Sequence, residues 1–298
     1  MATVLITSEF FGKFDDAARK MLVNAGHKVI DNPYGHKFLS PEEIIPYARD
    51  SDAFICDLEK ITKEVIDAAP KLKIISRRGV GVDNVDCRYA DSKGIEVART
   101  LGIVEAPVAE LVMAYILHFS RNVSQMNTMM HQGIWQKLMS LSVEGKTLGI
   151  AGMGNIGIQV AKRAAAFGMK ILYYSRSRNE VAEKEYGAKK ASFDELLSAS
   201  DFISVNMALT EETRGLFDYT AFSKMKQSAY FINTARGAII NEQDLKKALD
   251  EKLISGAALD VFDIEPQTES IFKGMDNVIL TPHIGSFTRE VFIKMDIA

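Results

Sequence analysis

The sequence predicts an α/β protein with two domains, each built around a parallel β-sheet. Short apolar runs alternate with helix-like stretches along all 298 residues. Strands that alternate with helices are typical of βαβ units, whose strands run parallel. One long helical pattern after residue 106 divides this alternation into two series. The length also suits about two domains of roughly 150 residues each.

We expect the first domain over residues 1–99. Its strand candidates are short apolar runs at 3–7, 28–30, 53–56, 73–76 and 95–98. Apolar residues at helical spacing separate several of these runs, at 14–26, 40–50 and 61–70. The order of the elements therefore predicts a sheet covered by helices.

A long helix is predicted from Pro107 to about Gln132. Pro107 suits the first turn of a helix, and Gly133 suits the position after its end. Its apolar residues recur at intervals of three and four and include several methionines. This stripe is expected to pack into the core, and it consists of Val112, Ile116, Phe119, Val123, Met126 and Met130.

The second domain is expected over residues 100–286. Its strand candidates lie at 146–151, 170–174, 202–206, 229–233, 256–261 and 277–282. The last stretch, 286–298, again has a helical pattern, and it ends without a stop signal.

The composition excludes several classes of protein. Apolar residues make up 47% and charged residues 25%, as in ordinary globular proteins. The formal charge of -3 argues against a nucleic-acid partner. No apolar run approaches the ~20 residues that span a bilayer, and the first residues do not resemble a signal peptide. The two cysteines, Cys56 and Cys87, form no disulfide framework, so we expect a protein of the reducing cytoplasm.

A glycine-rich turn predicts a dinucleotide site. The segment GMGNIG contains Gly152, Gly154, Asn155, Ile156 and Gly157, and it lies between a strand candidate and a helix candidate. In this context the first glycine allows a tight turn, the second lets the backbone approach a pyrophosphate, and the third lets helix and strand pack closely. Free N–H groups at the start of the helix attract the phosphate. The second domain is therefore expected to be Rossmann-like, and the first flavodoxin-like or Rossmann-like.

The next strand candidate ends in YYSRSR, and this segment predicts NADP rather than NAD. NAD sites place an acidic residue near this point for the ribose 2′-hydroxyl. Here Ser175 occupies that position, followed by Arg176, Ser177 and Arg178. An acid would repel the 2′-phosphate of NADP, whereas two arginines and two hydroxyl groups can bind it. NAD is the second choice.

Three further strand candidates end in residues that can handle a proton or bind a carboxylate. Arg236 follows one, Asp260, Asp263 and Glu265 follow another, and His283 follows the third. Ligands of open α/β sheets bind outside the carboxyl ends of the strands. A histidine with a carboxylate neighbour can exchange a proton, and an arginine can bind a substrate carboxylate with two hydrogen bonds. These parts suit the reduction of a 2-oxo acid, although spacing alone leaves open which carboxylate pairs with His283.

Other histidines and known motifs add nothing to this site. His27, His36, His118 and His131 lack such a setting and are expected to be structural. No cluster of cysteine and histidine has the spacing of metal ligands, so no metal is predicted. The nucleophile motif G-x-S-x-G is also absent from the sequence.

The motifs GMGNIG, TARG, DIEP and TPHIG, in this order, resemble those of the D-isomer-specific 2-hydroxyacid dehydrogenases. The resemblance implies a substrate domain formed by residues 1–99 with 287–298, a dinucleotide domain over 100–286, and a homodimer. It implies that Glu265 is the partner of His283 and that Arg236 binds the substrate. It also implies a cofactor site lined by Val108, Thr234, Ala235, Asp260 and Gly285.

The segment RRGVGVDNVD at 77–86 resembles the substrate loop of that family. The resemblance implies that N–H groups around Val80 and Gly81 bind the substrate carboxylate. Arg77 matches an arginine that phosphoglycerate dehydrogenases use to bind a substrate phosphate, although a structural arginine at a strand end is an equal alternative.

Three functions remain open from the sequence. The first is an NADP-dependent reductase of a small 2-oxo acid of the glyoxylate or hydroxypyruvate type, because YYSRSR resembles the cofactor loop of such reductases. The second is a 3-phosphoglycerate dehydrogenase, which Arg77 suggests. The third is a dinucleotide-sensing regulatory protein similar to the corepressors related to this family. The triad Arg236, Glu265 and His283 favours the enzymes.

Overall fold

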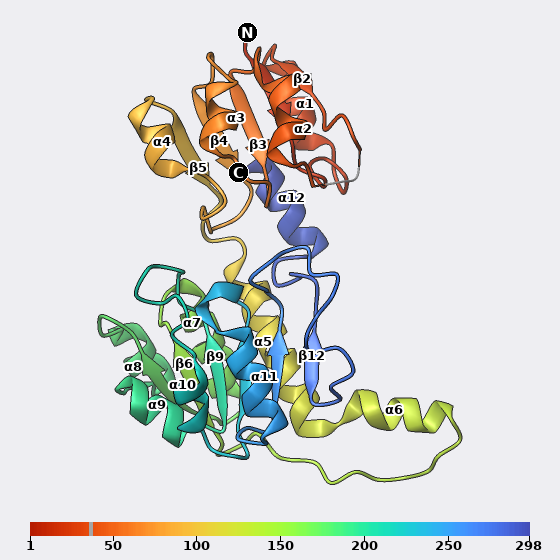
Figure 1. Cartoon of the computed structure of the whole chain (residues 1–298), viewed down its shortest axis with the longest axis vertical. Coiled ribbons are helices and arrows are strands. Elements are labelled where there is room, and N and C mark those ends of the chain that lie inside the picture. The colour runs from red at the N-terminus through yellow and green to blue at the C-terminus, as the bar shows by residue number, and fades with distance from the viewer. Residues whose placement is uncertain (36–37) are drawn as a thin grey trace. The chain divides into compact units, whose positions relative to one another are not determined.

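The structure is a computed structural model that describes residues 1–35 and 38–298. His36 therefore lies outside the described residues. The chain divides into two compact units (Figure 1): an N-terminal unit of Met1–Val104 with Phe287–Ala298, and a C-terminal unit of Glu105–Ser286. Each unit contains one sheet whose strands all pair in parallel, so the predicted α/β class is confirmed.

The N-terminal unit contains a five-stranded sheet in the order β2-β1-β3-β4-β5. Its strands lie within the predicted runs or one residue from them, and buried residues occur in the three central strands β1, β3 and β4, where a parallel strand needs a nearly continuous apolar run. The strands are β1 (Thr3–Ile6), β2 (Lys28–Ile30), β3 (Ala53–Cys56), β4 (Ile74–Arg77) and β5 (Glu96–Arg99).

Short helices connect these strands. In α2 a capping box closes the first turn, since Ser40 accepts from the N–H of Glu43 and Glu43 accepts from the N–H of Ser40. The helices are α1 (Ala17–Asn24), α2 (Pro41–Ala48), α3 (Lys63–Asp67) and α4 (Cys87–Ser92).

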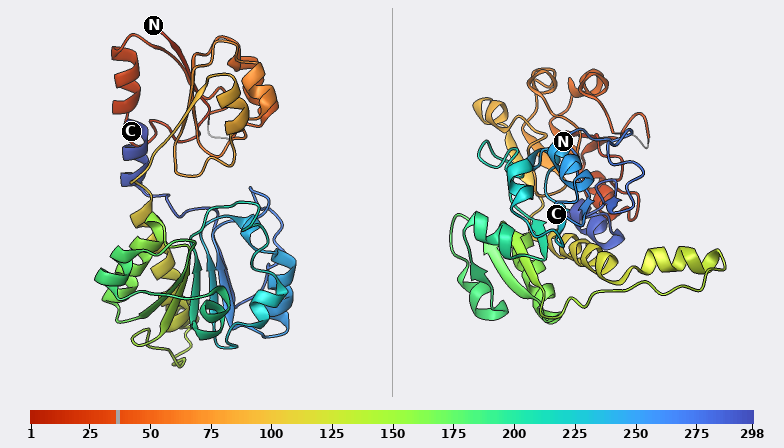
Figure 2. Two further views of the ribbon diagram at one scale, coloured as in Figure 1. Left: turned by 90° about the vertical axis from the view of Figure 1, so that its left-hand side faces the viewer. Right: turned by 60° about the horizontal axis from the view of Figure 1, so that its bottom comes forward.

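The last helix of the chain, α12 (Arg289–Ile297), belongs to the N-terminal unit (Figures 1 and 2). Asp296 on this helix forms a buried ion pair with Arg78, whose guanidinium also bonds to Asp57 at 2.7 Å. The rings of Phe10 and Phe14 contact Phe292 edge to face, with centroids 5.4 and 5.6 Å away. The first hundred residues and the last twelve therefore share one hydrophobic cluster.

The C-terminal unit contains a seven-stranded sheet in the order β12-β11-β10-β9-β6-β7-β8. The chain starts in the middle of the sheet, moves to one edge, and then returns to build the other half. The crevice of such a sheet lies where the order reverses, beside β6 and β9. The strands are β6 (Thr147–Ala151), β7 (Lys170–Tyr174), β8 (Lys189–Lys190), β9 (Phe202–Val205), β10 (Tyr230–Asn233), β11 (Gly256–Leu259) and β12 (Val278–Leu280).

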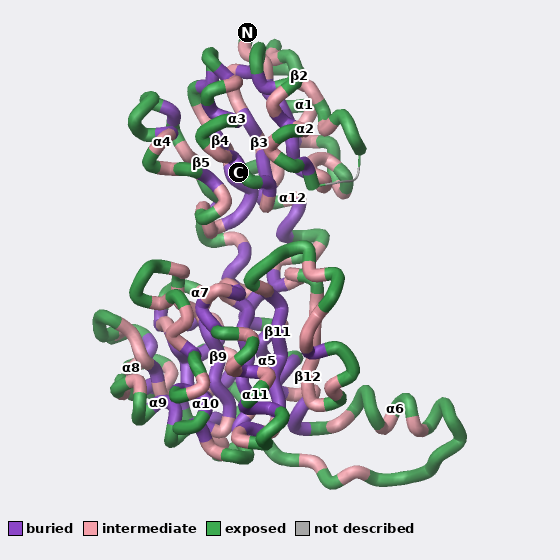
Figure 3. Tube along the Cα trace, viewed as in Figure 1, coloured by how far each residue is buried: buried purple, intermediate pink, exposed green. Residues whose placement is uncertain are grey.

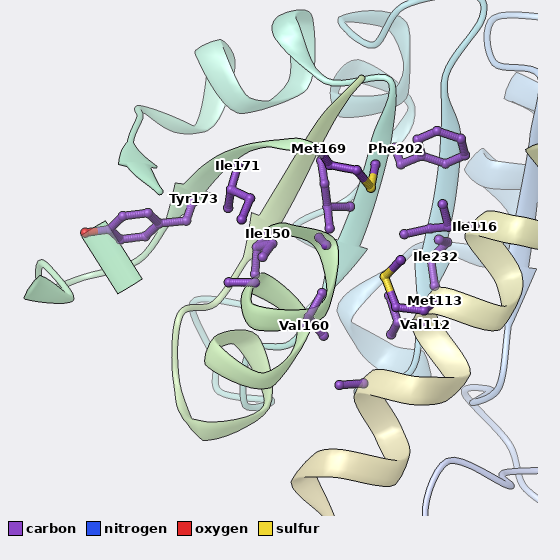
Figure 4. Close-up of a cluster of buried hydrophobic side chains, with 14 of the residues drawn as sticks. Val112, Met113, Ile116, Ile150, Val160, Met169, Ile171, Tyr173, Phe202 and Ile232 are labelled. Atoms are coloured by element: carbon purple, nitrogen blue, oxygen red, sulfur yellow. The ribbon is translucent and has the colours of Figure 1, made fainter. Parts of the chain in front are cut away.

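Helices cover both faces of this sheet, as the views in Figures 1 and 2 show. They are α5 (Glu105–Arg121), α6 (Val123–His131), α7 (Asn155–Ala166), α8 (Glu180–Tyr186), α9 (Phe193–Ala199), α10 (Tyr219–Ser223), the 3₁₀ helix η1 (Gly237–Ile239) and α11 (Glu242–Asp250). On one face α5 and α7 pack against β6 and β7, and Figure 4 shows the side chains that fill this layer. Those labelled include Val112, Met113, Ile116, Ile150, Val160, Ile171 and Phe202.

The prediction of one helix from Pro107 to Gln132 was wrong. Asn122 adopts a left-handed conformation, with φ 50° and ψ 28°, and this separates α5 from α6. Asparagine tolerates this region better than most residues. The apolar spacing continues across the break, so periodicity alone did not reveal it.

The predicted core packing of the stripe was also wrong for its second half. Val112, Ile116 and Phe119 of α5 are buried, but no residue of α6 is buried. Val123 is 62% exposed and Met130 is 51% exposed. Figures 1 and 3 show that α6 and the segment after it extend away from the rest of the C-terminal unit and are mostly exposed. We call α6 and residues 132–142 the arm.

No helix among the described residues is long and apolar enough to cross a membrane.

Candidate active site

The glycine turn between β6 and α7 has the backbone that the sequence predicted. Gly152 has φ +100°, and a side chain there would lie 2.7 Å from the backbone of Asn206 and Met207. A side chain at Gly157 would lie 2.2 Å from the carbonyl oxygen of Gly152. By contrast, a side chain at Gly154 would meet no protein atom within 4 Å. The space in front of Gly154, at the start of α7, is therefore open to a ligand.

The loop after β7 follows a strand that pairs with β6 and β8. Ser175 is half-buried, whereas Arg176, Ser177 and Arg178 are exposed. Arg178 bonds to Glu183 of α8 at 2.5 Å, and Glu183 also accepts a hydrogen bond from the Tyr173 hydroxyl at 2.6 Å. In the described part of the chain, no carboxylate forms an ion pair with Arg176. The two arginines therefore differ in their availability to a ligand, because Arg178 already forms an ion pair with Glu183.

An open cavity of about 850 Å³ lies beside this loop. Its lining carries four basic side chains and two acidic ones, Glu183 and Glu195. Two of the basic residues come from β8, and the Nζ atom of Lys190 donates to the carbonyl oxygen of Arg176 at 3.3 Å. The basic residues are Arg176, Arg178, Lys189 and Lys190. Sequence analysis did not select the two lysines.

The segment after β10 is fixed by a buried asparagine. Asn233 is fully buried, and its side chain donates to the carbonyl of Arg236 at 2.9 Å and accepts from the N–H of Ala235 at 3.0 Å. A side chain at Gly237 would lie 1.9 Å from the backbone of Phe262, so the loops after β10 and β11 touch at this glycine. The tight turn holds Arg236 close to the loop that carries Glu265.

His283 and Glu265 form a hydrogen-bonded pair. The distance from His283 Nδ1 to Glu265 Oε2 is 2.7 Å, and the side chains are 24% and 27% exposed. The other oxygen of Glu265 accepts from the N–H of Phe262 at 2.9 Å. Burial alone would raise the pKa of Glu265, but the hydrogen bond and charge of His283, with a smaller effect of Arg236, lower it below its usual value. The carboxylate is therefore charged near neutral pH and can stabilise an imidazolium. Neither Asp260 nor Asp263 is the partner.

The turn that carries His283 is backbone-strained. His283 has φ +54°, a region that non-glycine residues rarely adopt. Such outliers are typical of functional sites, where the surrounding structure holds them. Its N–H donates to the carbonyl of Asp260 at 2.9 Å.

Val108, Asp260 and Gly285 lie together. A side chain at Gly285 would lie 3.1 Å from a carboxylate oxygen of Asp260 and 3.3 Å from Val108. Asp260 is 1% exposed, and its carboxylate accepts from the N–H groups of Ile284 and Gly285, each at 2.8 Å. Burial raises the pKa of Asp260 despite these donors. Val108, Asp260 and Gly285 are distant in sequence but thus form one buried cluster beside the carboxyl ends of β11 and β12.

Two buried polar atoms, just after the carboxyl ends of β9 and β10, suit a bound cofactor. Among the described residues, the side-chain oxygens Asn206 Oδ1 and Thr234 Oγ1 are buried and have no hydrogen-bond partner. Unsatisfied buried polar atoms are uncommon and call for a ligand or water. Together with the open space at Gly154, they fit a dinucleotide. Within the described ranges, no group of three or more histidine, cysteine, aspartate or glutamate residues could hold a metal ion.

The predicted substrate loop belongs to the N-terminal unit. Gly79 has φ +143°, and Val80 and Gly81 are half-buried. Arg77 is 7% exposed, and its guanidinium donates to the carbonyl of Arg78 and fills the space in front of Gly79. This position favours the structural interpretation of Arg77 over a phosphate-binding one.

Comparison with known proteins gives consistent results. Residues 113–285 match the family model described as D-isomer specific 2-hydroxyacid dehydrogenase, NAD binding domain. The chain is 42% identical to a glyoxylate reductase from Thermococcus litoralis, over 83% of this chain and 78% of that protein. It is 38% identical to a hydroxypyruvate reductase from Thermotoga maritima, over 93% and 90% of the two chains. The solved structure of a glyoxylate reductase from Paecilomyes thermophila superposes with a TM-score of 0.86 at 31% identity, over 99% of this chain and 92% of that one.

Proposed function

The chain belongs to the D-isomer-specific 2-hydroxyacid dehydrogenase family, and from this premise we propose that it is an NADPH-dependent reductase of small 2-oxo acids such as glyoxylate and hydroxypyruvate. Members of this family are oxidoreductases that act on the CH–OH group of a 2-hydroxy acid with a nicotinamide cofactor. The similarity to glyoxylate and hydroxypyruvate reductases supports the substrate class.

The observation that carries the proposal is the pair formed by His283 and Glu265 at the carboxyl ends of the strands, with Arg236 on the neighbouring loop. The nicotinamide cofactor, when bound, supplies the hydride. His283 gives a proton to the carbonyl oxygen of the substrate and recovers it in the reverse direction. Glu265 orients the ring through Nδ1, which leaves Nε2 for the substrate, and stabilises the charged form.

Arg236 is proposed to bind the substrate. Its planar guanidinium can bind the carboxylate and the neighbouring oxo group at once, which orients the carbonyl carbon for the hydride. We retain the prediction that N–H groups around Val80 and Gly81 also bind the substrate carboxylate.

The preference for NADPH is proposed on the loop after β7. Ser175 takes the place of the acidic residue of NAD sites, Arg176 forms no ion pair with a carboxylate among the described residues, and Lys190 lies beside it. We assign the 2′-phosphate to the cavity that these residues line, with Arg176 and Lys190 as its main cations. Arg178 contributes less, because Glu183 already neutralises it.

The arm supports the proposal of a homodimer. The arm exposes several large apolar side chains, and large exposed apolar surfaces are uncommon on monomers. These side chains include the one tryptophan of the chain, Trp135, which is 81% exposed, and Met139, which is 94% exposed. A second copy of the chain is the proposed occupant. The two cysteines are free, and this supports a reducing cytoplasm as the proposed location.

The two alternatives have less support. The buried position of Arg77 weakens the interpretation as a 3-phosphoglycerate dehydrogenase. A regulatory protein that only senses dinucleotides would not need His283 held in a strained conformation against Glu265.

A turnover assay tests these proposals together. Glyoxylate, hydroxypyruvate, pyruvate and 3-phosphohydroxypyruvate are each offered with NADPH and with NADH. We expect the highest kcat/KM for glyoxylate or hydroxypyruvate with NADPH. The highest value for the phosphorylated acid would instead identify a phosphoglycerate dehydrogenase, and no turnover with tight dinucleotide binding would identify a sensor.

A further inference from the structure

A chain of side-chain hydrogen bonds leads from α5 to the turn that carries His283. The Tyr115 hydroxyl lies 2.5 Å from Thr281 Oγ1, and Thr281 Oγ1 lies 2.6 Å from Asp260 Oδ1. These three residues come from α5, the end of β12 and the end of β11, and none of them is a neighbour in sequence of another.

The number of protons fixes the direction of this chain. The Thr281 hydroxyl has one proton, and it donates that proton to the carboxylate of Asp260. It must therefore accept from Tyr115, whose hydroxyl is the donor. Tyr115 is 4% exposed, and burial raises the pKa of its hydroxyl far above the usual value, so the donor keeps its proton.

Asp260 is the point where this chain meets the His283 turn. Its carboxylate accepts from Thr281 and from the N–H groups of Ile284 and Gly285, and its carbonyl accepts from the N–H of His283. Four donors from residues 281–285 thus converge on one residue. The contacts hold the turn in a shape that puts His283 at φ +54° and its ring against Glu265.

We infer that Tyr115 and Thr281 are positioning residues, which act through Asp260 to hold the His283 ring against Glu265. The inference deepens the proposed function and rests on its assignment of His283 as the proton donor. Neither side chain needs to touch substrate or cofactor for this role. Without the Tyr115 hydroxyl, the Thr281 oxygen loses the one donor that it has among the described residues and can turn away from Asp260, which leaves the strained turn less constrained.

Conservative variants test the inference. Tyr115→Phe and Thr281→Val each remove one hydroxyl with little change of shape, whereas Thr281→Ser keeps it. Tyr219→Phe is the matched control, because it removes a tyrosine hydroxyl that bonds to Glu251 on the surface at 2.6 Å. We expect kcat to fall roughly ten- to hundredfold in the first two variants, as for a misplaced catalytic group, with KM and thermal stability nearly unchanged. Thr281→Ser and Tyr219→Phe should behave as the wild type.

A spectroscopic measurement separates positioning from stability without turnover. The proton between His283 and Glu265 should give a downfield NMR signal that is assigned by its loss in His283→Ala. We expect this signal to broaden or move upfield in Tyr115→Phe and Thr281→Val, and to stay in Thr281→Ser. The double variant should be no worse than Thr281→Val alone, because the two residues act in series.

Two outcomes would overturn the inference: the NMR signal and kcat unchanged in Tyr115→Phe and Thr281→Val, or equal losses in Thr281→Ser and Thr281→Val. A different result would contradict the proposed function itself: His283→Ala would retain normal turnover, whatever the results for the other variants.

Discussion

The Nδ1–H of His283 donates to the carboxylate of Glu265 over 2.7 Å at the carboxyl end of the sheet, and it does so from a backbone conformation that few residues other than glycine adopt. The lowered pKa of Glu265 keeps this carboxylate charged beside the imidazole. The ring is thereby held through Nδ1 while Nε2 stays available.

Removal of the imidazole is the first prediction. His283→Ala should lower the rate of 2-oxo acid reduction by roughly 10²- to 10⁴-fold, the usual contribution of a general acid. Dinucleotide binding, measured by fluorescence titration, should change little. His27→Ala in the N-terminal unit is the control and should keep full turnover.

The charge of Glu265 determines the pH dependence. Reduction needs the protonated ring, and Glu265→Gln removes the anion that favours it. The high-pH limb of the kcat/KM profile for reduction should therefore move to lower pH, while the profile for oxidation of the 2-hydroxy acid extends to lower pH. A profile that stays in place would show that Glu265 does not act on the ring.

The proposed role of Arg236 predicts how its replacement affects substrate binding. Arg236→Lys keeps the positive charge but loses the planar pair of donors. We expect a large fall in kcat/KM for every 2-oxo acid, with unchanged dinucleotide affinity. Arg214→Lys replaces an exposed arginine of the same unit and serves as the control. Equal activity in both variants would mean that the carboxylate binds elsewhere.

Substitutions in and beside the loop after β7 are predicted to change the preference for NADPH over NADH. Hydrogen bonds to charged groups contribute about 1.5–3 kcal/mol, and about 1.4 kcal/mol corresponds to tenfold in affinity. Arg176→Ala and Lys190→Ala should each weaken NADPH binding roughly ten- to hundredfold and leave NADH binding nearly unchanged. Ser175→Asp should go further and prefer NADH, because the new carboxylate repels the phosphate and accepts from the ribose hydroxyl.

Calorimetric titration of both dinucleotides checks this prediction. Lys184→Ala, which removes an exposed lysine of α8 outside the cavity, controls for a general loss of positive charge. Equal losses for NADPH and NADH, or a wild type that prefers NADH, would leave the arginines as a solvated surface.

The arm predicts the oligomeric state. Replacing Trp135 and Met139 with serine removes two highly exposed apolar side chains from the proposed interface. Light scattering after gel filtration should show a dimer for the wild type and a monomer for the double variant. Val181→Ser, which replaces a valine that is 51% exposed on α8, should remain dimeric. A monomeric wild type would rule out the interface.

Buried Glu59 predicts a pH-dependent stability. It is 2% exposed, one oxygen accepts from the N–H of Asp57 at 2.6 Å, and burial, followed by repulsion from Asp57, raises its pKa from 4.5 to about 7. Below about pH 4.5 the group is protonated whether the chain is folded or not. As the pH rises toward 7 the unfolded chain loses this proton first, so the free energy of unfolding falls.

Glu59→Gln should remove this loss. With about 1.4 kcal/mol for each pKa unit, the variant should gain up to roughly 3 kcal/mol relative to the wild type between pH 4 and pH 8. Urea unfolding at several pH values measures the difference. Glu64→Gln on the exposed face of α3 should show no such trend, and a parallel pH dependence of wild type and Glu59→Gln would contradict the assignment.

The sequence predicted every strand of both sheets except β8, because buried parallel strands need apolar runs, whereas β8 consists of two exposed lysines. It predicted the pairing of His283 with Glu265 only through the family resemblance, since three carboxylates follow the same strand. The prediction of a single helix from 107 to 132 was wrong at Asn122, where one left-handed residue breaks the helix although the apolar periodicity continues on both sides.

The roles that residues play through tertiary contacts could not be predicted from the sequence. Lys190 reaches the cofactor loop because β8 pairs with β7, although a whole helix separates them along the chain. Thr281 begins the TPHIG motif, but nothing in the sequence pairs it with Tyr115, which is 166 residues away. A hydrogen bond between such residues depends on the sheet order, which becomes visible only when the fold is known.

The placement of α12 in the N-terminal unit has a consequence for the order of events on the ribosome. Domains of nascent chains generally fold from the N-terminus onward, but here Arg78 receives its buried partner Asp296 only after residue 296 has been synthesised. The C-terminal unit is continuous and emerges complete before that moment. The unit whose translation begins first is therefore completed last, and until then Arg78 has Asp57 as an acidic partner but lacks Asp296.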